Sequence, residues 1–286
     1  MYRILKKRNL TPVTKLFVVD APLVTRHVQP GHFVIVRTGE GGERIPLTVA
    51  DFDREEGTIT IVVQEVGKTS AMINELEEGD AFSDFVGPLG QKAPLPESGR
   101  VVCIGGGFGI APAYPIAKEL NQRENVEVTS IIGARTADLL ILAEEMESVS
   151  EDLRICTDDG SLGYHGFVTG VLQEVIDAGE QIDEVIAVGP MPMMRGTAEV
   201  TRPYGLKTWV SLDPIMVDGT GMCGACRVTI NGEMKFACVD GPFFDAHTVD
   251  FEESTKRVKM YVKEEELAYK SFQQDHECRR GGGISG

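Results

Sequence analysis

The chain of 286 residues is poor in positive charge and cysteine, and it has no long apolar run. Its 28 Lys and Arg are outnumbered by 44 Asp and Glu, and the net charge of −16 disfavours binding to nucleic acid or anionic membranes. No apolar stretch reaches the roughly 18 residues that a membrane-spanning helix needs. The basic start MYRILKKRNL has no apolar h-region behind it, so we expect no secretory signal.

Six cysteines are too few for a disulfide scaffold in a chain of this length. Three of them, Cys223, Cys226 and Cys238, lie close together in the sequence. Such a cluster indicates a metal site in a reducing compartment, and we therefore expect a cytoplasmic protein. Cys103 and Cys156 fall within apolar strand patterns and are expected to be inert core residues.

The first part of the chain, residues 1–98, has the pattern of an antiparallel barrel. The runs KLFVVDAP, HFVIVRT and TITIVVQEV are rich in β-branched and aromatic residues and are bounded by Gly, Pro and Asp. Several such strands at short spacing are typical of a barrel. A short helix is predicted over SAMINELEEGD, with Thr69 or Ser70 as its N-cap and Gly79 at its end.

The rhythm changes near residue 100. The strands VVCIGGG, VEVTSIIGAR, LRICTDDGS and DEVIAV alternate with the helices IAPAYPIAKELNQ, ADLLILAEEMESVS and TGVLQEVIDAG, and a turn is expected at GPMPMM. This alternation predicts a doubly wound parallel sheet over residues 99–205. The third part, residues 206–286, contains the clustered cysteines. A segment this small commonly needs a staple such as a metal centre.

The glycine-rich loop IGGGFGIAP follows a strand and opens a helix. Its glycines allow the backbone to approach a pyrophosphate, and a helix N-terminus favours anionic oxygens. The loop departs from the G-x-G-x-x-G fingerprint because Ile110 stands at the third glycine position. A tight strand-to-helix turn without a ligand remains the alternative.

Three more strand ends, GAR, TDDGS and GPMPMM, are expected at the same edge of the sheet, where open α/β sheets bind ligands. Arg135 could reach an adenosine phosphate or only cap a helix. Asp158 and Asp159 could bind ribose or shape a turn, and the methionines are more typical of packing. In the barrel, Thr69 and Ser70 open a helix whose free N–H groups could hold phosphate, or they serve only as a cap.

The cysteine spacing is Asp218-x4-Cys223-x2-Cys226-x11-Cys238. Plant-type [2Fe-2S] ferredoxins use C-x4-C-x2-C and a later Cys, so Asp218 occupies the first ligand position. Zinc held by the three cysteines and His247 is one alternative. A second is a [2Fe-2S] cluster with Cys278 as its fourth ligand, and a third is three buried thiols without metal.

Taken together, PLT (46–48), GKTS (67–70), GPLG (87–90), GGGFGIAP, TDDGS and VGPMPMM occur in the order of a known family. The chain resembles the ferredoxin–NADP reductase superfamily, in the subgroup with a C-terminal [2Fe-2S] domain. Two branches are candidates: the small subunits of electron-bifurcating NADH-dependent ferredoxin:NADP oxidoreductases, and the electron-transfer subunits of dihydroorotate dehydrogenase. The second branch has Cys where this chain has Asp218, so the aspartate favours the first.

The resemblance implies an oxidoreductase subunit. It would exchange hydride between NAD(H), or NADP(H), and FAD held by the barrel. Single electrons would then pass through the [2Fe-2S] cluster to a larger flavin and iron–sulfur partner in a heterodimer. No acid–base residue is implied, because hydride transfer depends on positioning. A zinc-stapled, non-enzymatic NAD-binding regulator is the alternative from another class.

The resemblance also implies the site residues. The cluster ligands would be Asp218, Cys223, Cys226 and Cys238. The family commonly has Arg directly before the Pro of its flavin motif, whereas here Ile45 takes that place and Arg44 precedes it. The implied cofactor-binding residues are Arg44, Ile45, Pro46, Leu47, Thr48, Val62, Val63, Gln64, Gly67, Lys68, Thr69, Ser70, Gly106, Gly107, Gly109, Ala111, Pro112, Arg135, Asp158, Asp159, Gly160, Gly189, Pro190 and Met191.

Overall fold

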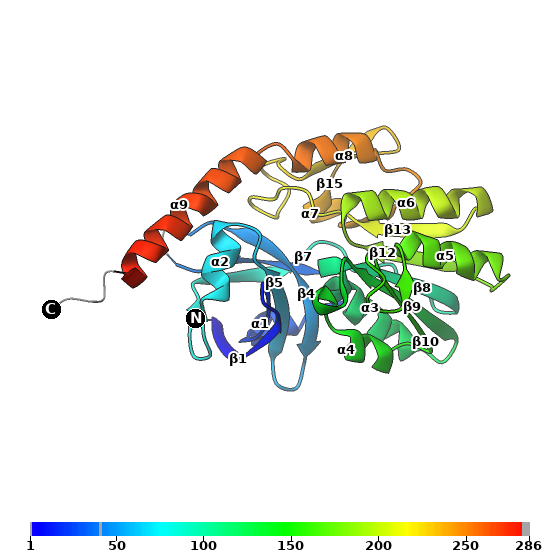
Figure 1. Ribbon diagram of the computed structural model, residues 1–286, viewed down its shortest axis with the longest axis horizontal. Helices are drawn as coiled ribbons and strands as arrows, with labels where there is room; N and C mark the ends of the chain where they lie inside the picture. The colour runs from blue at the N-terminus through cyan, green and yellow to red at the C-terminus, as the bar shows by residue number, and fades with distance from the viewer. Residues whose placement is uncertain (1, 40–41, 282–286) are drawn as a thin grey trace.

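A computed structural model describes residues 2–39 and 42–281 of the chain, with side chains as far as residue 274. Figure 1 shows a barrel beside a helix-covered sheet, with the C-terminal part lying across both. Among the described residues, no helix is both long and apolar enough to cross a membrane.

The N-terminal part forms a barrel-like sheet in the order β6-β1-β2-β5-β4-β3-β7, with every neighbouring pair antiparallel. This confirms the predicted antiparallel barrel. Its elements are β1 (Tyr2–Thr11), β2 (Thr14–Asp20), α1 (Pro22–Thr25), β3 (Phe33–Arg37), β4 (Ile45–Asp53), β5 (Thr58–Gln64), α2 (Lys68–Asn74), β6 (Ala81–Phe82) and β7 (Asp84–Leu89).

Alternation along β3 and β4 separates two faces of the barrel wall. Val34, Val36, Leu47 and Val49 point into the barrel core, where they join a cluster of apolar side chains. Ile35 belongs instead to the apolar core shared with the C-terminal part. Successive strand residues face opposite sides, so this outer face is available to build a site.

Helix α2 is shorter than the sequence pattern predicts. It begins after Gly67 as N-cap and ends at Asn74, before Gly79. The predicted cap Ser70 lies inside the helix, and its hydroxyl accepts the backbone N–H groups of Val66 and Gly67 at 2.9 and 3.0 Å. The side chain therefore closes the turn from within, so the predicted cap position was wrong.

The second sheet has the order β11-β10-β9-β8-β12-β13-β16, and all its pairs are parallel except β13 with β16. This confirms the doubly wound prediction. Strands β8 and β12 are neighbours although β9 and β10 intervene in the chain, which creates a topological switch point. The strands are β8 (Gly99–Gly106), β9 (Val126–Ala134), β10 (Asp152–Thr157), β11 (Tyr164–His165), β12 (Glu184–Val188), β13 (Lys207–Ser211) and β16 (Phe243–Asp245).

Helices cover both faces of this sheet. Val101 and Cys103 of β8 pack toward α3 and α4, whereas Val102 and Ile104 pack toward α5 and α6. The GPMPMM segment was predicted as a turn, but Met191 begins a helix, because Pro190 and Pro192 suit a helix start. The helices are α3 (Ile110–Asn121), α4 (Ala143–Ser148), α5 (Val168–Asp177) and α6 (Met191–Thr201).

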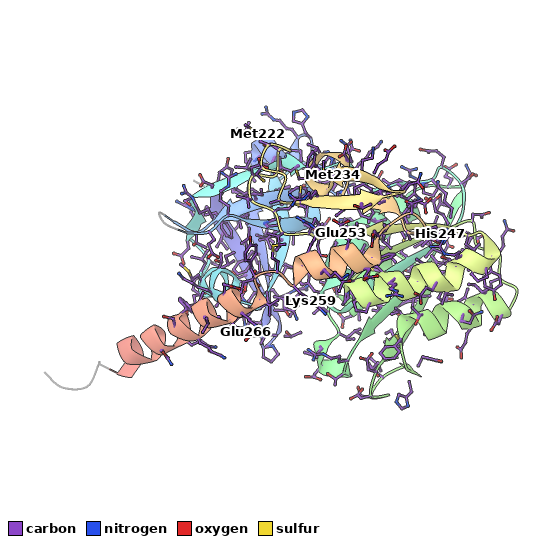
Figure 2. The ribbon with its side chains drawn as sticks, turned by 90° about the horizontal axis from the view of Figure 1, so that it is seen from above. Met222, Met234, His247, Glu253, Lys259 and Glu266 are labelled. Carbon is purple, nitrogen blue, oxygen red and sulfur yellow. The ribbon has the colours of Figure 1, made fainter. Side chains whose placement is uncertain are left out.

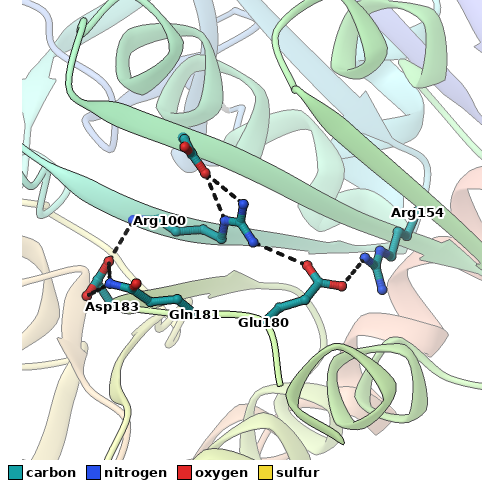
Figure 3. Close-up of polar contacts among 6 residues, drawn as sticks. Arg100, Arg154, Glu180, Gln181 and Asp183 are labelled. Carbon is teal, nitrogen blue, oxygen red and sulfur yellow. Dashed lines mark hydrogen bonds and ion pairs between the residues drawn. The ribbon is translucent and has the colours of Figure 1, made fainter. Parts of the chain in front are cut away.

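An ion-pair network ties together the strands at the opposite end of the sheet from the glycine loop. Glu180 joins Arg100, at 3.4 Å, to Arg154, at 2.6 Å, and Arg100 also contacts Glu127 at 2.7 Å (Figure 3). The Asp183 carboxylate accepts the backbone N–H of Arg100 at 2.8 Å. The network links the starts of β8, β9, β10 and β12.

The C-terminal part is joined to both other parts. It adds β16 to the parallel sheet, and Gln91 beyond the barrel donates to the backbone oxygens of Gly241 and Val239 at 2.6 and 2.8 Å. Its elements are β14 (Arg227–Ile230), β15 (Glu233–Phe236), α7 (Ala237–Asp240), α8 (Phe251–Val258) and α9 (Val262–Gly281). The sequence pattern predicts no element over α9, which has no apolar stripe. Figure 1 shows it running past α2.

Candidate cofactor cavity and cysteine loop

A cavity of about 1100 Å³ lies between the barrel and the carboxyl edge of the parallel sheet. Single-ligand pockets usually measure about 300–1,000 Å³, so this one has room for an extended or double occupant. It collects the start of β4, the end of β5, the start of α2 and the ends of β8, β9, β10, β12 and β13. Apart from the end of β13, these are the segments that the sequence motifs select.

Most of the predicted cofactor-binding residues line this cavity. They are Ile45, Pro46, Leu47, Thr48, Val63, Gln64, Gly67, Lys68, Thr69, Ser70, Gly106, Gly107, Gly109, Pro112, Arg135, Asp158, Gly189 and Pro190. The fold therefore brings together residues from separate motifs of two parts of the chain.

Six of the predicted residues lie outside the cavity wall. Val62 and Ala111 are buried in the apolar core. Asp159 and Gly160 form an exposed turn in which the Asp159 carboxylate accepts the Ser161 hydroxyl at 2.6 Å. Two more, Arg44 and Met191, are respectively exposed and half-buried away from the lining. Adjacent residues of one motif therefore face the cavity, the core or the solvent, and the motif alone does not tell which of them line the cavity.

The glycines of the loop have two distinct physical roles. A Cβ on Gly109 would lie 2.1 Å from the Val188 carbonyl oxygen, so only glycine lets α3 approach β12. Gly107 has φ +54° and no atom near its missing Cβ, so it serves the left-handed turn and leaves open space. The packing explanation therefore accounts for Gly109, while Gly107 leaves the backbone accessible at the helix start.

The start of α2 forms the barrel side of the cavity. The Thr69 hydroxyl donates to Glu43, and the Ser70 hydroxyl donates to the Gly67 carbonyl at 2.9 Å. Both hydroxyls are thus engaged within the protein. At this helix start, the unbonded backbone N–H groups and Lys68 remain as donors, a set that fits phosphate oxygens.

Several lining residues were missed by sequence reasoning. Phe108 and Met193 lie beside the glycine loop, and Glu265 and Ala268 come from α9. Asp213 follows β13 and lines the cavity, where its side chain is accessible to solvent. The protein atoms around it still displace part of the water from the carboxylate, which raises its pKa to about 6. No motif marks these positions, because only the strand order and the path of α9 bring them to the cavity.

The loop over residues 217–226, called the cysteine loop below, and the helix α7 place two of the predicted metal ligands in contact. The sulfurs of Cys226 and Cys238 are 3.2 Å apart and buried, whereas Cys223 is exposed. Burial, then the neighbouring Cys226, raises the pKa of the Cys238 thiol to about 12. The N–H of Ala225 points at the Cys223 sulfur at 3.5 Å, the kind of contact that tunes iron–sulfur sites.

Asp218 closes this loop. Its carboxylate accepts the N–H groups of Thr220, Met222 and Cys223 at 3.0, 3.0 and 2.8 Å, and these bonds hold its pKa below the usual range. Within the described residues, no three His, Cys, Asp or Glu side chains are grouped for metal binding. The thiol pair supplies two sulfur ligands of the kind that iron–sulfur centres use, while the Asp218 oxygens accept bonds from their own loop.

His247, one of the two rival ligands, is not brought to the thiols. The His247 Nε2 atom lies 3.0 Å from the Thr201 hydroxyl at the end of α6, and its backbone N–H donates to Asp245. Figure 2 shows His247 apart from Met222 of the cysteine loop, whose side chain is 88% exposed. The side chain of Cys278 lies outside the described residues. Cys103 and Cys156 are buried, as expected.

Comparison with known proteins agrees with this division of sites. The iron–sulfur cluster binding domain of dihydroorotate dehydrogenase B matches residues 213–250. The oxidoreductase NAD-binding domain matches residues 103–199. Fold and site thus define an oxidoreductase with a nicotinamide-nucleotide domain and an iron–sulfur domain, and the matches confirm both predicted cofactor classes.

Relatives that align over most of the chain show to which family of oxidoreductases the protein belongs. The chain is 46% identical over 269 residues to a Thermotoga maritima homolog of the electron transfer subunit of dihydroorotate dehydrogenase B (NAD(+)), covering 94% of each. It is 33% identical over 255 residues to that subunit of Geobacillus thermodenitrificans, covering 86% of this chain and 96% of the relative. The protein therefore belongs to the family of dihydroorotate dehydrogenase B-type electron-transfer subunits.

A solved structure is similar over almost the whole chain. It is described as giving insights into flavin-based electron bifurcation via the NADH-dependent reduced ferredoxin–NADP oxidoreductase. The TM-score is 0.90 at 44% identity, covering 96% of this chain and 98% of that one. The predicted resemblance to the superfamily and to these two branches is thereby confirmed.

Proposed function

We propose that the protein is the NAD(H)-oxidising electron-transfer subunit of an electron-bifurcating ferredoxin:NADP oxidoreductase. In this proposal, hydride passes from NADH to FAD within the cavity, and single electrons leave through a [2Fe-2S] cluster in the cysteine loop. A larger flavin and iron–sulfur subunit would receive them. The observation that carries the proposal is that one face of β3–β4 adjoins both the cavity and the cysteine loop.

The nucleotide would bind along the carboxyl edge of the parallel sheet. Gly107 leaves the backbone open at the start of α3, where N–H groups and the helix dipole favour a pyrophosphate. Arg135 and Asp158 lie at neighbouring strand ends, suited to the adenosine phosphate and ribose. The names of the relatives support NAD(H) as the nucleotide. Arg135 could also hold the adenosine phosphate of NADP(H), so binding of NADP(H) is one outcome of the test.

The flavin would occupy the barrel side of the same cavity. Ile45 to Thr48 would contact its ring and ribityl chain, and the backbone at Thr69 and Ser70, with Lys68, would hold its phosphates. When bound, FAD supplies an acceptor for two electrons that releases them singly. The residues of this chain bind both reactants and exclude water between them, so we assign no acid or base.

The proposed cluster ligands are Asp218, Cys223, Cys226 and Cys238. The matched iron–sulfur domain contains all four and ends before Cys278, which supports this set. The negative charge of Asp218 also contributes to the raised pKa of the Cys238 thiol, which supports proximity of the carboxylate to this thiol. Asp218 would then serve both as ligand and as acceptor of loop N–H groups.

Substitution of Asp218 separates these two roles. Asp218→Cys should keep the cluster but change its potential and visible spectrum, whereas Asp218→Ala should lose most of the iron, because ligand and loop closure both disappear. Cys278→Ser serves as the matched control and should retain a native spectrum. Loss of the cluster in Cys278→Ser, with an unaltered spectrum in Asp218→Cys, would reverse the assignment.

Flavin, iron, sulfide and zinc analysis of the purified native complex tests the proposal as a whole. We expect FAD, iron and acid-labile sulfide in this subunit, together with a larger co-purifying subunit. A colourless, zinc-containing protein would instead establish the NAD-binding regulator.

The matched family favours one second function, electron transfer for dihydroorotate oxidation. The two functions are separated by assaying the complex with ferredoxin and NADP, or with dihydroorotate. Turnover of dihydroorotate without ferredoxin reduction would select the second function.

We propose three working parts for the chain: a flavin part at 1–98, a nucleotide part from residue 99, and the cluster part with its tail up to residue 286. The predicted boundary at 205/206 precedes β13, although Lys207–Ser211 pairs within the parallel sheet. We therefore propose to extend the nucleotide part through β13. A cytoplasmic location belongs to the same proposal, because clustered reduced thiols suit a reducing compartment.

A further inference from the structure

Asp213 occupies a distinctive place in the cavity. It lies just after Ser211, the last residue of β13, and both residues line the cavity. Strand β13 is parallel to β12, so its end meets the carboxyl edge at which the glycine loop lies. No sequence motif assigns a role to this side chain.

The strand order fixes which end of a nucleotide Asp213 would meet. Along the edge the strands run β10, β9, β8, β12 and β13 (Figure 1). Asp158 and Arg135 lie at the ends of β10 and β9, and the glycine loop lies at β8. A dinucleotide with its pyrophosphate at β8 and adenosine toward Arg135 extends its other end past Gly189 toward Asp213. That end carries the nicotinamide.

The carboxylate of Asp213 has no hydrogen bond or ion pair to another residue in the described part of the chain. The charged side chains that share the cavity wall are Glu43, Lys68, Arg135, Asp158 and Glu265. None of them contributes to the raised pKa of Asp213, which burial alone causes. The Asp213 carboxylate, which has no positively charged partner among the described residues, therefore faces the space in which the nicotinamide ring would lie.

We propose that Asp213 is the counter-ion of the oxidised nicotinamide ring. The inference rests on the proposed function, because it requires NAD(H) in this cavity. In the reaction, the C4–H bond of NADH breaks and its electron pair moves with the hydrogen to the flavin. The ring is left with one positive charge, which an adjacent carboxylate stabilises.

This role distinguishes the two forms of the nucleotide. NAD⁺ carries a ring charge and NADH does not, so only NAD⁺ gains from ionised Asp213. With a pKa of about 6, Asp213 is mostly protonated at pH 5 and almost fully ionised at pH 8. Binding of a cation to the ionised form links affinity to pH, so the Kd for NAD⁺ should fall by up to about tenfold between these values.

Calorimetric titration of the flavin-loaded holoprotein with NAD⁺ from pH 5 to 8 tests the inference. The wild-type Kd should fall as the pH rises, and Asp213→Asn should bind NAD⁺ with an affinity that does not change with pH. Asp213→Glu, which restores a carboxylate, should recover the dependence. Asp158→Asn, at the adenosine end, should keep the wild-type slope whatever its affinity.

A flat wild-type profile, or an unchanged slope in Asp213→Asn, would refute the counter-ion role. Binding of NAD⁺ with such a profile leaves the proposed function intact and overturns only this inference. If wild-type holoprotein binds NAD⁺ at no pH, nucleotide binding in the cavity fails and the inference fails with it. Flavin absorbance at each pH verifies that the variants remain folded and loaded.

Discussion

Ile35 and Pro46 are direct partners across β3 and β4, and their side chains leave the barrel wall on the same side. Pro46 lines the cofactor cavity. Ile35 packs against the cysteine loop so closely that a Cβ on Gly219 would lie 2.5 Å from its Cδ1 atom. Opposed residues in such a pair have Cβ atoms about 4.5–5.5 Å apart. One pair of side chains therefore bridges the two proposed redox sites.

Replacing Gly219 by alanine should disrupt this junction. Gly219 has φ +75°, so alanine adds backbone strain of roughly 1–2 kcal/mol as well as the clash with Ile35. We expect Gly219→Ala to lose iron and sulfide while the barrel still binds flavin. Iron and flavin content of the purified variant measure the effect.

Gly232 provides the matched control. It has φ +76° but no atom within 4 Å of its missing Cβ. Gly232→Ala therefore carries similar strain without the clash and should retain the iron content. Equal iron loss in both variants would show that strain, and not contact with Ile35, governs the loop.

Helix α9 should help to retain the flavin. Glu265 and Ala268 of this helix line the cavity, and the Tyr269 hydroxyl donates to Glu65 at 2.5 Å. A net hydrogen bond contributes about 1 kcal/mol, so Tyr269→Phe should release flavin about fivefold faster on dilution. Tyr261→Phe, which alters a half-exposed tyrosine just before the helix, should match the wild type. Identical release from all three proteins would remove α9 from the flavin site.

Asp213 should make the protein less stable as the pH rises through the weakly acidic range. Its pKa is raised from 3.8 to about 6, so between these values the folded state binds more protons than the unfolded state. Stability then falls from about pH 4 to pH 6 and is level above. Asp213→Asn should raise the melting temperature more at pH 7.5 than at pH 4.5. An equal shift at both values would contradict the raised pKa.

Glu180 should contribute to stability without affecting the cofactor cavity. It bridges Arg100 and Arg154 at the opposite edge of the sheet, with all three side chains about one-third exposed or less. Partly exposed pairs contribute up to about 1 kcal/mol, so Glu180→Gln should lower Tm by about 2–4 °C, and less at high salt. Glu199→Gln, from the exposed pair with Arg195, should change Tm less. A shifted pH profile for NAD⁺ binding in Glu180→Gln would show that the network acts on the cavity.

The sequence pattern was sufficient to predict the two sheets. Short β-branched and aromatic runs between Gly, Pro and Asp indicate the barrel strands, and alternating strand and helix patterns indicate the parallel sheet. Strand ends then predicted Gly107, Arg135 and Asp158 as neighbours, since parallel strands end at one edge. The same reasoning could not separate Asp158, which lines the cavity, from Asp159, which turns toward Ser161.

Other site residues depend on long-range topology. Asp213 reaches the cavity only because β13 pairs with β12, and Glu265 only because α9 passes α2. Helix α9 is polar on most of its surface, so no apolar stripe predicts it. The Cys226–Cys238 contact agrees with the spacing, whereas the bonds of Asp218 to its own loop required the coordinates.

The most direct test of the central claim is anaerobic addition of NADH to the purified holoprotein, followed by visible absorption and by electron paramagnetic resonance at low temperature. If electrons pass from the cavity to the cysteine loop, flavin bleaching is accompanied by the signal of a reduced [2Fe-2S] cluster. That signal should be absent from Gly219→Ala. Flavin bleaching in the wild type without any cluster signal, in a protein that contains its full iron, would contradict the claim.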